Sequence, residues 1–302
     1  MAGFILRTLT VVSVWALAVI PAVHAQRSPA RQTDWSTVDS ALGRKGVANP
    51  GQVMKYSFPR GDLQVTVQGV RLKPALALGS WVAFKQTGGG QAMMMGDLVL
   101  ADDEVSPVMH ALQAGGVQQT ALHNHVLGES PRVMYMHVAA HGDPLKIAQT
   151  LHGAIGASRT PMTMPAPATP EPIDLDTTAV ARALGFAGKV NGGVYQVSIP
   201  RREIIREGSG VIPAAMGVAT ALNFQPTGNG KAAITGDFVM IGGEVNAVIR
   251  ALHEHDIEVT ALHSHMLSES PRLFFMHFWA NDDAVKLAQG LRAALAKMAV
   301  KR

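Results

Sequence analysis

The sequence of 302 residues contains no cysteine, and this absence narrows the chemistry that the chain can perform. Disulfide bonds, thiolate metal ligands and cysteine nucleophiles are all excluded. A lipid-modified N-terminal cysteine is excluded as well, so we expect a soluble mature protein without a lipid anchor. The sequence also lacks any block of lysine and arginine interleaved with aromatic residues, and 26 basic residues stand against 22 acidic ones. This composition argues against nucleic acid as a partner.

Long apolar runs are missing everywhere except at the N-terminus. Arg7 precedes an apolar run from Leu9 to Val23, and Val23-His24-Ala25 then offers small residues where a signal peptidase reads. An uncleaved anchor needs about 20 apolar residues, and this run is shorter and contains Pro21. We therefore expect residues 1–25 to be a cleaved signal peptide. The mature protein would be periplasmic or secreted and would have no membrane anchor.

The strongest feature that is present is an internal repeat with an offset of 140 residues. Residues 120–137 (TALHNHVLGESPRVMYMH) and 260–277 (TALHSHMLSESPRLFFMH) are identical at 12 of 18 positions. The preceding stretches, 91–119 and 231–259, are identical at only nine of 29 positions. A recent duplication would spread its identity evenly. The chain therefore contains two diverged copies of one domain, and one short segment has hardly changed.

Composition and pattern predict how the copies are organised. Residues 156–176 are rich in proline, alanine and threonine and predict an extended linker between a first repeat (27–155) and a second (177–302). Each copy predicts helices and strands that do not alternate regularly, so the fold class is α+β. Related copies often bury equivalent faces against each other, so we expect a pseudo-two-fold arrangement of the tandem domains.

A histidine hairpin dominates the retained segment. Side chains alternate along a strand, so His123 and His125 point the same way. A hairpin around the Gly-Glu-Ser-Pro turn would place His123 opposite His137 and His125 opposite Tyr135. Three neutral imidazoles would then form an open metal site, with one position left for water or substrate. His263, His265 and His277 repeat the pattern, and we expect a divalent transition metal: zinc, iron, manganese or copper.

Two further pairs of residues belong to the same segment. Glu129 lies four residues beyond His125 and is a candidate catalytic residue, either as a metal ligand or as a general base on metal-bound water, and Glu269 corresponds to it. Arg132 and Arg272 follow the turn proline, where a guanidinium suits a carboxylate or phosphate of a bound substrate. The alternative is an arginine–glutamate pair that only stiffens the turn.

Other candidate residues have weaker patterns. Asp97 and Asp237 follow a glycine in strand-like runs, and they either orient a ligating imidazole or accept hydrogen bonds at a β-bulge. We favour the bulge. His110, His253 and His255 have no counterpart in the other copy, and we expect them to be solvated surface residues.

The paired segment L-H-x-H-x-L-x-E-S-P-R…M-H, the upstream Gly-Asp and the duplication resemble the LppY/LpqO family of exported bacterial proteins over nearly the whole mature chain. The resemblance implies an envelope or secreted location and no particular reaction. Several members look like lipoproteins, and this chain departs from them because it has no cysteine.

Three functions fit these observations. The first is a periplasmic metal-dependent enzyme acting on an anionic small molecule, hydrolytic if Glu129 is a base and redox if it is a ligand. The second is a non-enzymatic protein that binds a metal or a small ligand. The third is a structural envelope protein whose histidines pack or bond locally. We favour a metal-binding site, because both copies retain all three histidines.

Overall fold

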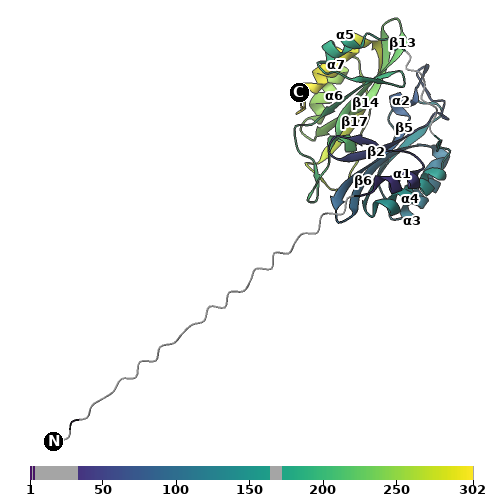
Figure 1. Ribbon diagram of the computed structural model, residues 1–302. Coiled ribbons are helices and arrows are strands. Elements are labelled where there is room, and N and C mark those ends of the chain that lie inside the picture. The colour runs from purple at the N-terminus through teal and green to yellow at the C-terminus, as the bar shows by residue number, and fades with distance from the viewer. Residues whose placement is uncertain (2, 4–32, 164–171, 302) are drawn as a thin grey trace. The chain divides into compact units, whose positions relative to one another are not determined.

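The computed structural model describes residues 1, 3, 33–163 and 172–301 (Figure 1). The predicted signal peptide and the middle of the predicted linker lie outside these residues, apart from Met1 and Gly3. Contacts divide the chain into Met1–Ala30 and Arg31–Arg302, and all the helices and strands belong to the second unit. None of the helices in the described ranges is both long enough and apolar enough to cross a membrane.

The first repeat is a six-stranded antiparallel sheet in the order β1-β2-β5-β6-β8-β7. Its strands are β1 (Val47–Asn49), β2 (Val53–Pro59), β5 (Gly79–Gly88), β6 (Gln91–Ala101), β7 (Gln118–His123) and β8 (Val133–Gly142), and a small ribbon is formed by β3 (Thr66–Val67) and β4 (Val70–Arg71). Its helices are α1 (Trp35–Leu42), α2 (Pro74–Ala77), the 3-10 helix η1 (Asp102–Glu104), α3 (Val105–Ala114) and α4 (Pro144–Gly156).

The second repeat has the same sheet, in the equivalent order β9-β10-β13-β14-β17-β15. Its strands are β9 (Lys189–Asn191), β10 (Val194–Pro200), β11 (Arg206–Glu207), β12 (Gly210–Val211), β13 (Ala219–Gly228), β14 (Lys231–Ile241), β15 (Glu258–His263), β16 (Glu269–Ser270) and β17 (Leu273–Asp283). Its helices are α5 (Thr177–Leu184), the 3-10 helix η2 (Ala214–Met216), α6 (Val245–His253) and α7 (Ala284–Leu295). The predicted α+β class and tandem duplication are confirmed.

Local sequence explains where the last helix of each repeat begins. In the first repeat the Asp143 carboxylate accepts from two backbone N–H groups of α4, and Pro144 occupies the first helical position, where its missing N–H costs nothing. In the second repeat the Asp283 carboxylate accepts from one backbone N–H of α7, that of Lys286, and Ala284 stands in place of the proline.

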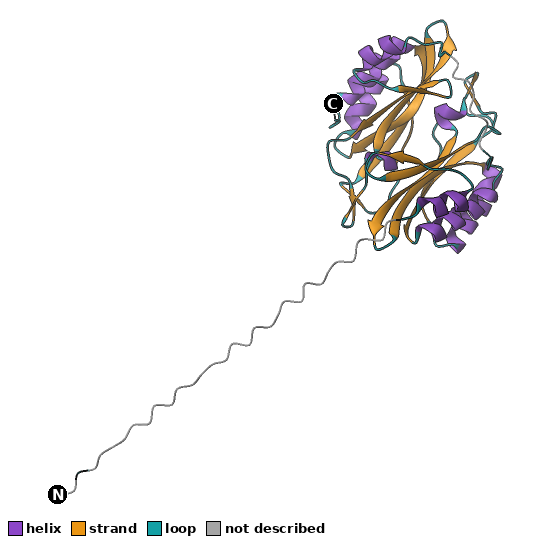
Figure 2. Cartoon of the chain, in the orientation of Figure 1, coloured by secondary structure: helices purple, strands orange, loops and turns teal. Residues whose placement is uncertain are grey.

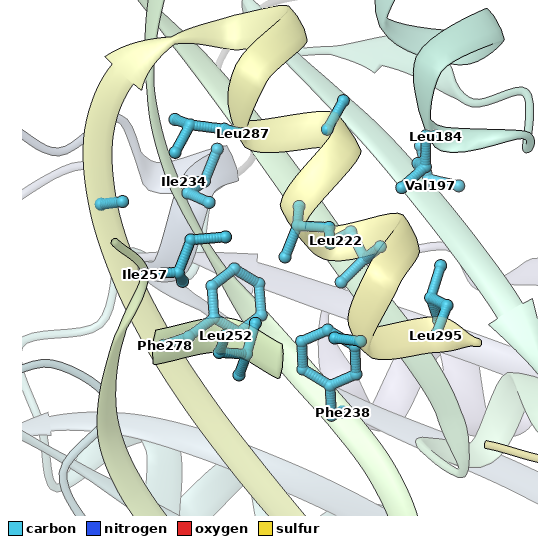
Figure 3. Packing of buried hydrophobic residues seen from close by; sticks show 14 of the residues in the cluster. Leu184, Val197, Leu222, Ile234, Phe238, Leu252, Ile257, Phe278, Leu287 and Leu295 are labelled. Atoms are coloured by element: carbon cyan, nitrogen blue, oxygen red, sulfur yellow. The ribbon is translucent and has the colours of Figure 1, made fainter. Parts of the chain in front are cut away.

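Each sheet buries one face under its own helices. In the second repeat Leu222, Phe238 and Phe278 of the sheet pack against Leu287 and Leu295 of α7 (Figure 3). An equivalent core lies beneath α1, α3 and α4 of the first repeat. These helices and α5, α6 and α7 occupy opposite sides of the folded unit, with the sheets between them (Figure 2). The remaining face of each sheet is thereby turned toward the other repeat.

Those inner faces are closed by an exchange of loops. The loop of the first repeat packs Leu72 and Leu76 with Trp279 of the second sheet. Ile212 and Met216, the corresponding residues of the second repeat, pack with Met93 and other residues of the first sheet. Matching residues thus make matching contacts in both directions, which confirms the predicted pseudo-two-fold arrangement.

Candidate metal centre

The histidine segments of the two repeats meet between the sheets. Their imidazoles form one group, which we call the six-histidine cluster: His123, His125, His137, His263, His265 and His277. Within it, two sets of ligand nitrogens each lie within 4.8 Å of one another. One set is His123, His125 and His137, and the other is His123, His263, His265 and His277. The sequence predicted convergence within each copy, and the structure adds that the two copies converge on each other.

The predicted pairing inside the hairpin is wrong by two residues. His123 lies opposite Tyr135, and His137 lies opposite Ala121. The register of β7 against β8 shifts between Gln119 and Ala121, because a bulge inserts one extra residue there. The same shift occurs in β15 of the second repeat. The connection from β7, which ends at His123, to β8, which begins at Val133, is longer than the tight turn we expected.

The residue at each bulge joins the two repeats. The hydroxyl of Thr120 donates to the backbone carbonyl of His265, at 2.6 Å. Thr260, its counterpart, donates to the carbonyl of His125. Each threonine therefore fixes the loop that carries a histidine of the other repeat. This reciprocal pair holds the six-histidine cluster together across the pseudo-two-fold axis.

The imidazole rings stack between the repeats. The ring centroids are 3.5 Å apart for His123 and His263, 3.7 Å for His125 and His277, and 3.5 Å for His137 and His265. His123 and His263 occupy equivalent positions, so their contact marks the pseudo-two-fold axis.

The histidines present neutral nitrogen donors. Burial lowers the pKa of His123 to about 4 and that of His277 to about 3, so both are neutral at pH 7. Their Nδ1–H groups donate to the carbonyls of Asn124, at 2.9 Å, and Gly236, at 2.8 Å, which leaves the lone pair on Nε2. Metal-binding histidines are commonly oriented by such a bond. Four of the Nε2 atoms are buried without a hydrogen-bond partner in the described part of the chain: those of His123, His125, His137 and His277.

Two aspartates lie beside the imidazoles. Asp97 faces His137 across β6 and β8, and Asp237 faces His277 across β14 and β17, with closest approaches of 3.8 and 3.2 Å. The pairing is regular at both positions, so the predicted bulge is wrong. Burial raises the pKa of Asp97 to about 8 against the opposing effect of Lys55, and burial together with Asp97 raises the pKa of Asp237.

The predicted glutamates and arginines of the turns lie elsewhere. Among the described residues, neither Glu129 nor Glu269 belongs to a set of candidate ligand atoms. The Glu269 carboxylate accepts from the first backbone N–H of β17 and from Arg272, at 2.8 and 3.2 Å. Arg132 is exposed, and its one ion-pair partner among the described residues is Asp102, at 4.0 Å. In the second repeat the arginine–glutamate pair that stiffens the turn is therefore present.

A cavity of about 560 Å³ adjoins the six-histidine cluster. Its polar lining includes Lys55, Asp97, His137, Asp237 and His265, together with the indole of Trp81. The Lys55 ammonium lies over the Trp81 ring, 4.0 Å from its centroid. Neither residue was predicted as a site residue, because the predicted residues were those on which the two copies agree. Lys55 and Trp81 correspond to Gln196 and Ala221, so disagreement was the signal.

Both repeats match one known protein family. The profile of a family described as Domain of Unknown Function (DUF1259) matches the chain twice, over residues 36–157 and 178–297. The chain belongs to the DUF1259 family. Each matched DUF1259 copy contributes three members of the six-histidine cluster. A search of curated proteins gave no significant match.

Solved structures resemble the DUF1259 chain only distantly. A trimeric bacterial microcompartment shell protein, PduB, is 13% identical, with a TM-score of 0.23, over 84% of this chain and 90% of its own. EtuB from Clostridium kluyveri is 10% identical, with a TM-score of 0.20, over 83% of this chain and 91% of its own. At these scores the likeness carries no argument about function.

Proposed function

We propose that this DUF1259 protein is exported and binds divalent transition-metal ions in the six-histidine cluster. The observation that carries the proposal is the convergence of buried, neutral Nε2 atoms that lack partners in the described chain. A buried polar atom left unpaired costs about 1–3 kcal/mol, and coordination to a metal would offset that cost. Imidazole favours zinc, iron or copper, and manganese is admissible if an aspartate joins the ligands. Export rests on the N-terminal sequence and on the LppY/LpqO resemblance.

The geometry favours up to two ions. His123 belongs to both sets of ligand atoms, but its Nδ1–H is engaged with a backbone carbonyl, so its Nε2 can serve one ion at a time. The six imidazoles then form two sets of three, one set from each hairpin, and each set binds one ion. Three protein ligands leave a coordination position open for water or substrate.

A metal-dependent enzyme acting on an anionic small molecule is the second candidate, and the adjoining cavity favours it over a purely structural role. The cavity gives a small molecule access to His137 and His265. Asp97 and Asp237 lie beside the imidazoles, so they are better placed than Glu129 or Glu269 to exchange protons with a metal-bound water. A non-enzymatic metal- or ligand-binding protein uses the same features without turnover.

Metal content decides the proposal. We expect the mature protein, purified without chelating resin and analysed by mass spectrometry of its elements, to hold up to two equivalents of metal. His125→Ala should remove one equivalent, and His125→Ala with His265→Ala should remove both. His110→Ala is the matched control, because His110 is exposed on α3 and should not affect the metal. Equal metal in wild type and double variant would refute the proposal, as would no uptake from zinc, iron or copper.

A further inference from the structure

The two sides of the pseudo-two-fold axis are closed differently. On one side, side-chain amides of the second sheet bond to the loop around α2 of the first repeat. Gln196 donates to the carbonyl of Ala75 at 2.6 Å, and Asn223 donates to that of Leu76 at 3.2 Å. Gln225 bonds this loop twice more, at 2.8 Å in each case. These bonds seal the loop onto the sheet.

The opposite side lacks that seal. The positions of Gln196, Asn223 and Gln225 are occupied there by Lys55, Ala83 and Lys85. Among the described residues, only Lys85 of these three bonds the covering loop, through the carbonyl of Val211. The cavity of about 560 Å³ lies on this side, beside Lys55 and the segment around η2, and residues of both sheets line it. Divergence of the copies has therefore placed hydrogen-bonding amides on one side and Lys55 beside a cavity on the other.

One cation points into this cavity. In the described part of the chain, the Lys55 ammonium has no hydrogen bond or ion pair, and it lies over the Trp81 ring. Gly217 lies close to the indole, with φ at +84°, and a Cβ there would lie 2.7 Å from the Trp81 ring. The residues around Trp81 are thus fitted to it, and Lys55 is left as an available anion contact.

We propose that the cavity binds a small organic monoanion through its carboxylate and Lys55, with the rest of the molecule facing the six-histidine cluster. The volume lies in the range of small-molecule sites. The described lining offers one cation, Lys55, so a carboxylate would be neutralised there while the second charge of a phosphate dianion would be buried without a partner. Only the contact with bound metal rests on the proposed function. The Lys55–carboxylate contact stands without it.

The test uses benzoate, and benzamide as its uncharged analogue, titrated into the metal-free and metal-loaded full-length mature protein by calorimetry or saturation-transfer NMR. We expect benzoate to bind metal-free protein at least about tenfold more tightly than benzamide. Lys55→Gln installs the residue of the second repeat and should reduce benzoate to the level of benzamide. Lys189→Gln makes the same charge change at an exposed site and should leave binding unchanged.

A second variant separates binding from a simple charge-balancing role. If Lys55 only compensates Asp97, Lys55→Gln will change stability and leave benzoate binding intact, which overturns the proposal. Ala214→Phe keeps Lys55 but fills the cavity, so it should abolish benzoate binding. Absence of binding by benzoate, or tighter binding of inorganic phosphate, also overturns it. If the protein takes up no metal but binds benzoate in a Lys55-dependent way, the metal proposal is refuted and the proposal of an anion site at Lys55 is supported.

Discussion

The reciprocal hydrogen bonds of Thr120 and Thr260 lead to a specific prediction about the free energy of unfolding. Replacing Thr260 with Val keeps the β-branched shape and removes the hydroxyl that donates to the carbonyl of His125. Replacing Thr120 with Val does the same for His265. If these bonds hold the repeats together, each loss should lower the free energy of unfolding of the whole unit, and should loosen a histidine loop in the other repeat.

The expected magnitudes follow from burial. Leaving a buried carbonyl unpaired costs about 1–3 kcal/mol. Thr260 is only 7% exposed, so Thr260→Val should cost about 2 kcal/mol, in the middle of that range. Thr120 is half-buried and water can partly replace its bond, so Thr120→Val should cost about 1 kcal/mol. The double variant should lose about 3 kcal/mol if the two sites act independently.

Urea denaturation of metal-free protein measures these losses as shifts in midpoint at constant slope. Thr150→Val is the matched control, because that hydroxyl bonds only the carbonyl of Lys146 within its own helix. The control should change the free energy of unfolding by less than about 0.5 kcal/mol. The reasoning is wrong if the double variant is no less stable than this control. Metal affinity should weaken in both single variants, since each loosens one histidine loop.

Three further outcomes follow. In metal-free protein, urea midpoints should rise from about pH 4 to 6.5, because burial lowers the pKa of His123 to about 4 and that of His277 to about 3 and the unfolded chain then binds more protons. Burial raises the pKa of Asp97 to about 8, so this group opposes the rise from about pH 4 upward, but the histidines of the cluster outnumber it. Above pH 6.5 the histidines no longer contribute and the midpoints should fall toward pH 8; a profile falling between pH 4 and 6.5 contradicts this. Gly236→Ala should cost about 1–3 kcal/mol, because its Cβ would overlap the backbone of β13, whereas Gly243→Ala, with open space around it, should be nearly neutral by the same denaturation assay. Either repeat expressed alone should aggregate or associate in size-exclusion chromatography, and a stable monomer would contradict the paired inner faces.

The sequence predicted those features that depend on local pattern. The duplication and the α+β class follow from repetition and periodicity. The retention of the same histidines in both copies also identified the segment that forms the candidate site.

Features that depend on contacts between the copies were not predictable from one copy. Nothing in the segment around His123 indicates which sheet face meets the other repeat. The sequence therefore fits one shared histidine cluster and two separate metal sites equally well. The bulge at Thr120 was missed because threonine suits a regular strand equally well. Its hydroxyl is satisfied by the other repeat, a partner that no local pattern reveals. The regular pairing of Asp97 was not predictable either, because it depends on which residue of β8 lies opposite it.

Covalent fusion of the two repeats has a consequence that the open cavity makes visible. Two identical subunits related by a true two-fold axis must present the same residue on both sides, so a lysine at one entrance would appear at the other. In a single chain, each half mutates separately while remaining tethered to its partner at high effective concentration. One half can therefore specialise in closure through Gln196 while the other becomes an entrance through Lys55. A fused pair of repeats can therefore give its six-histidine cluster one accessible side and one closed side, which a symmetric dimer cannot.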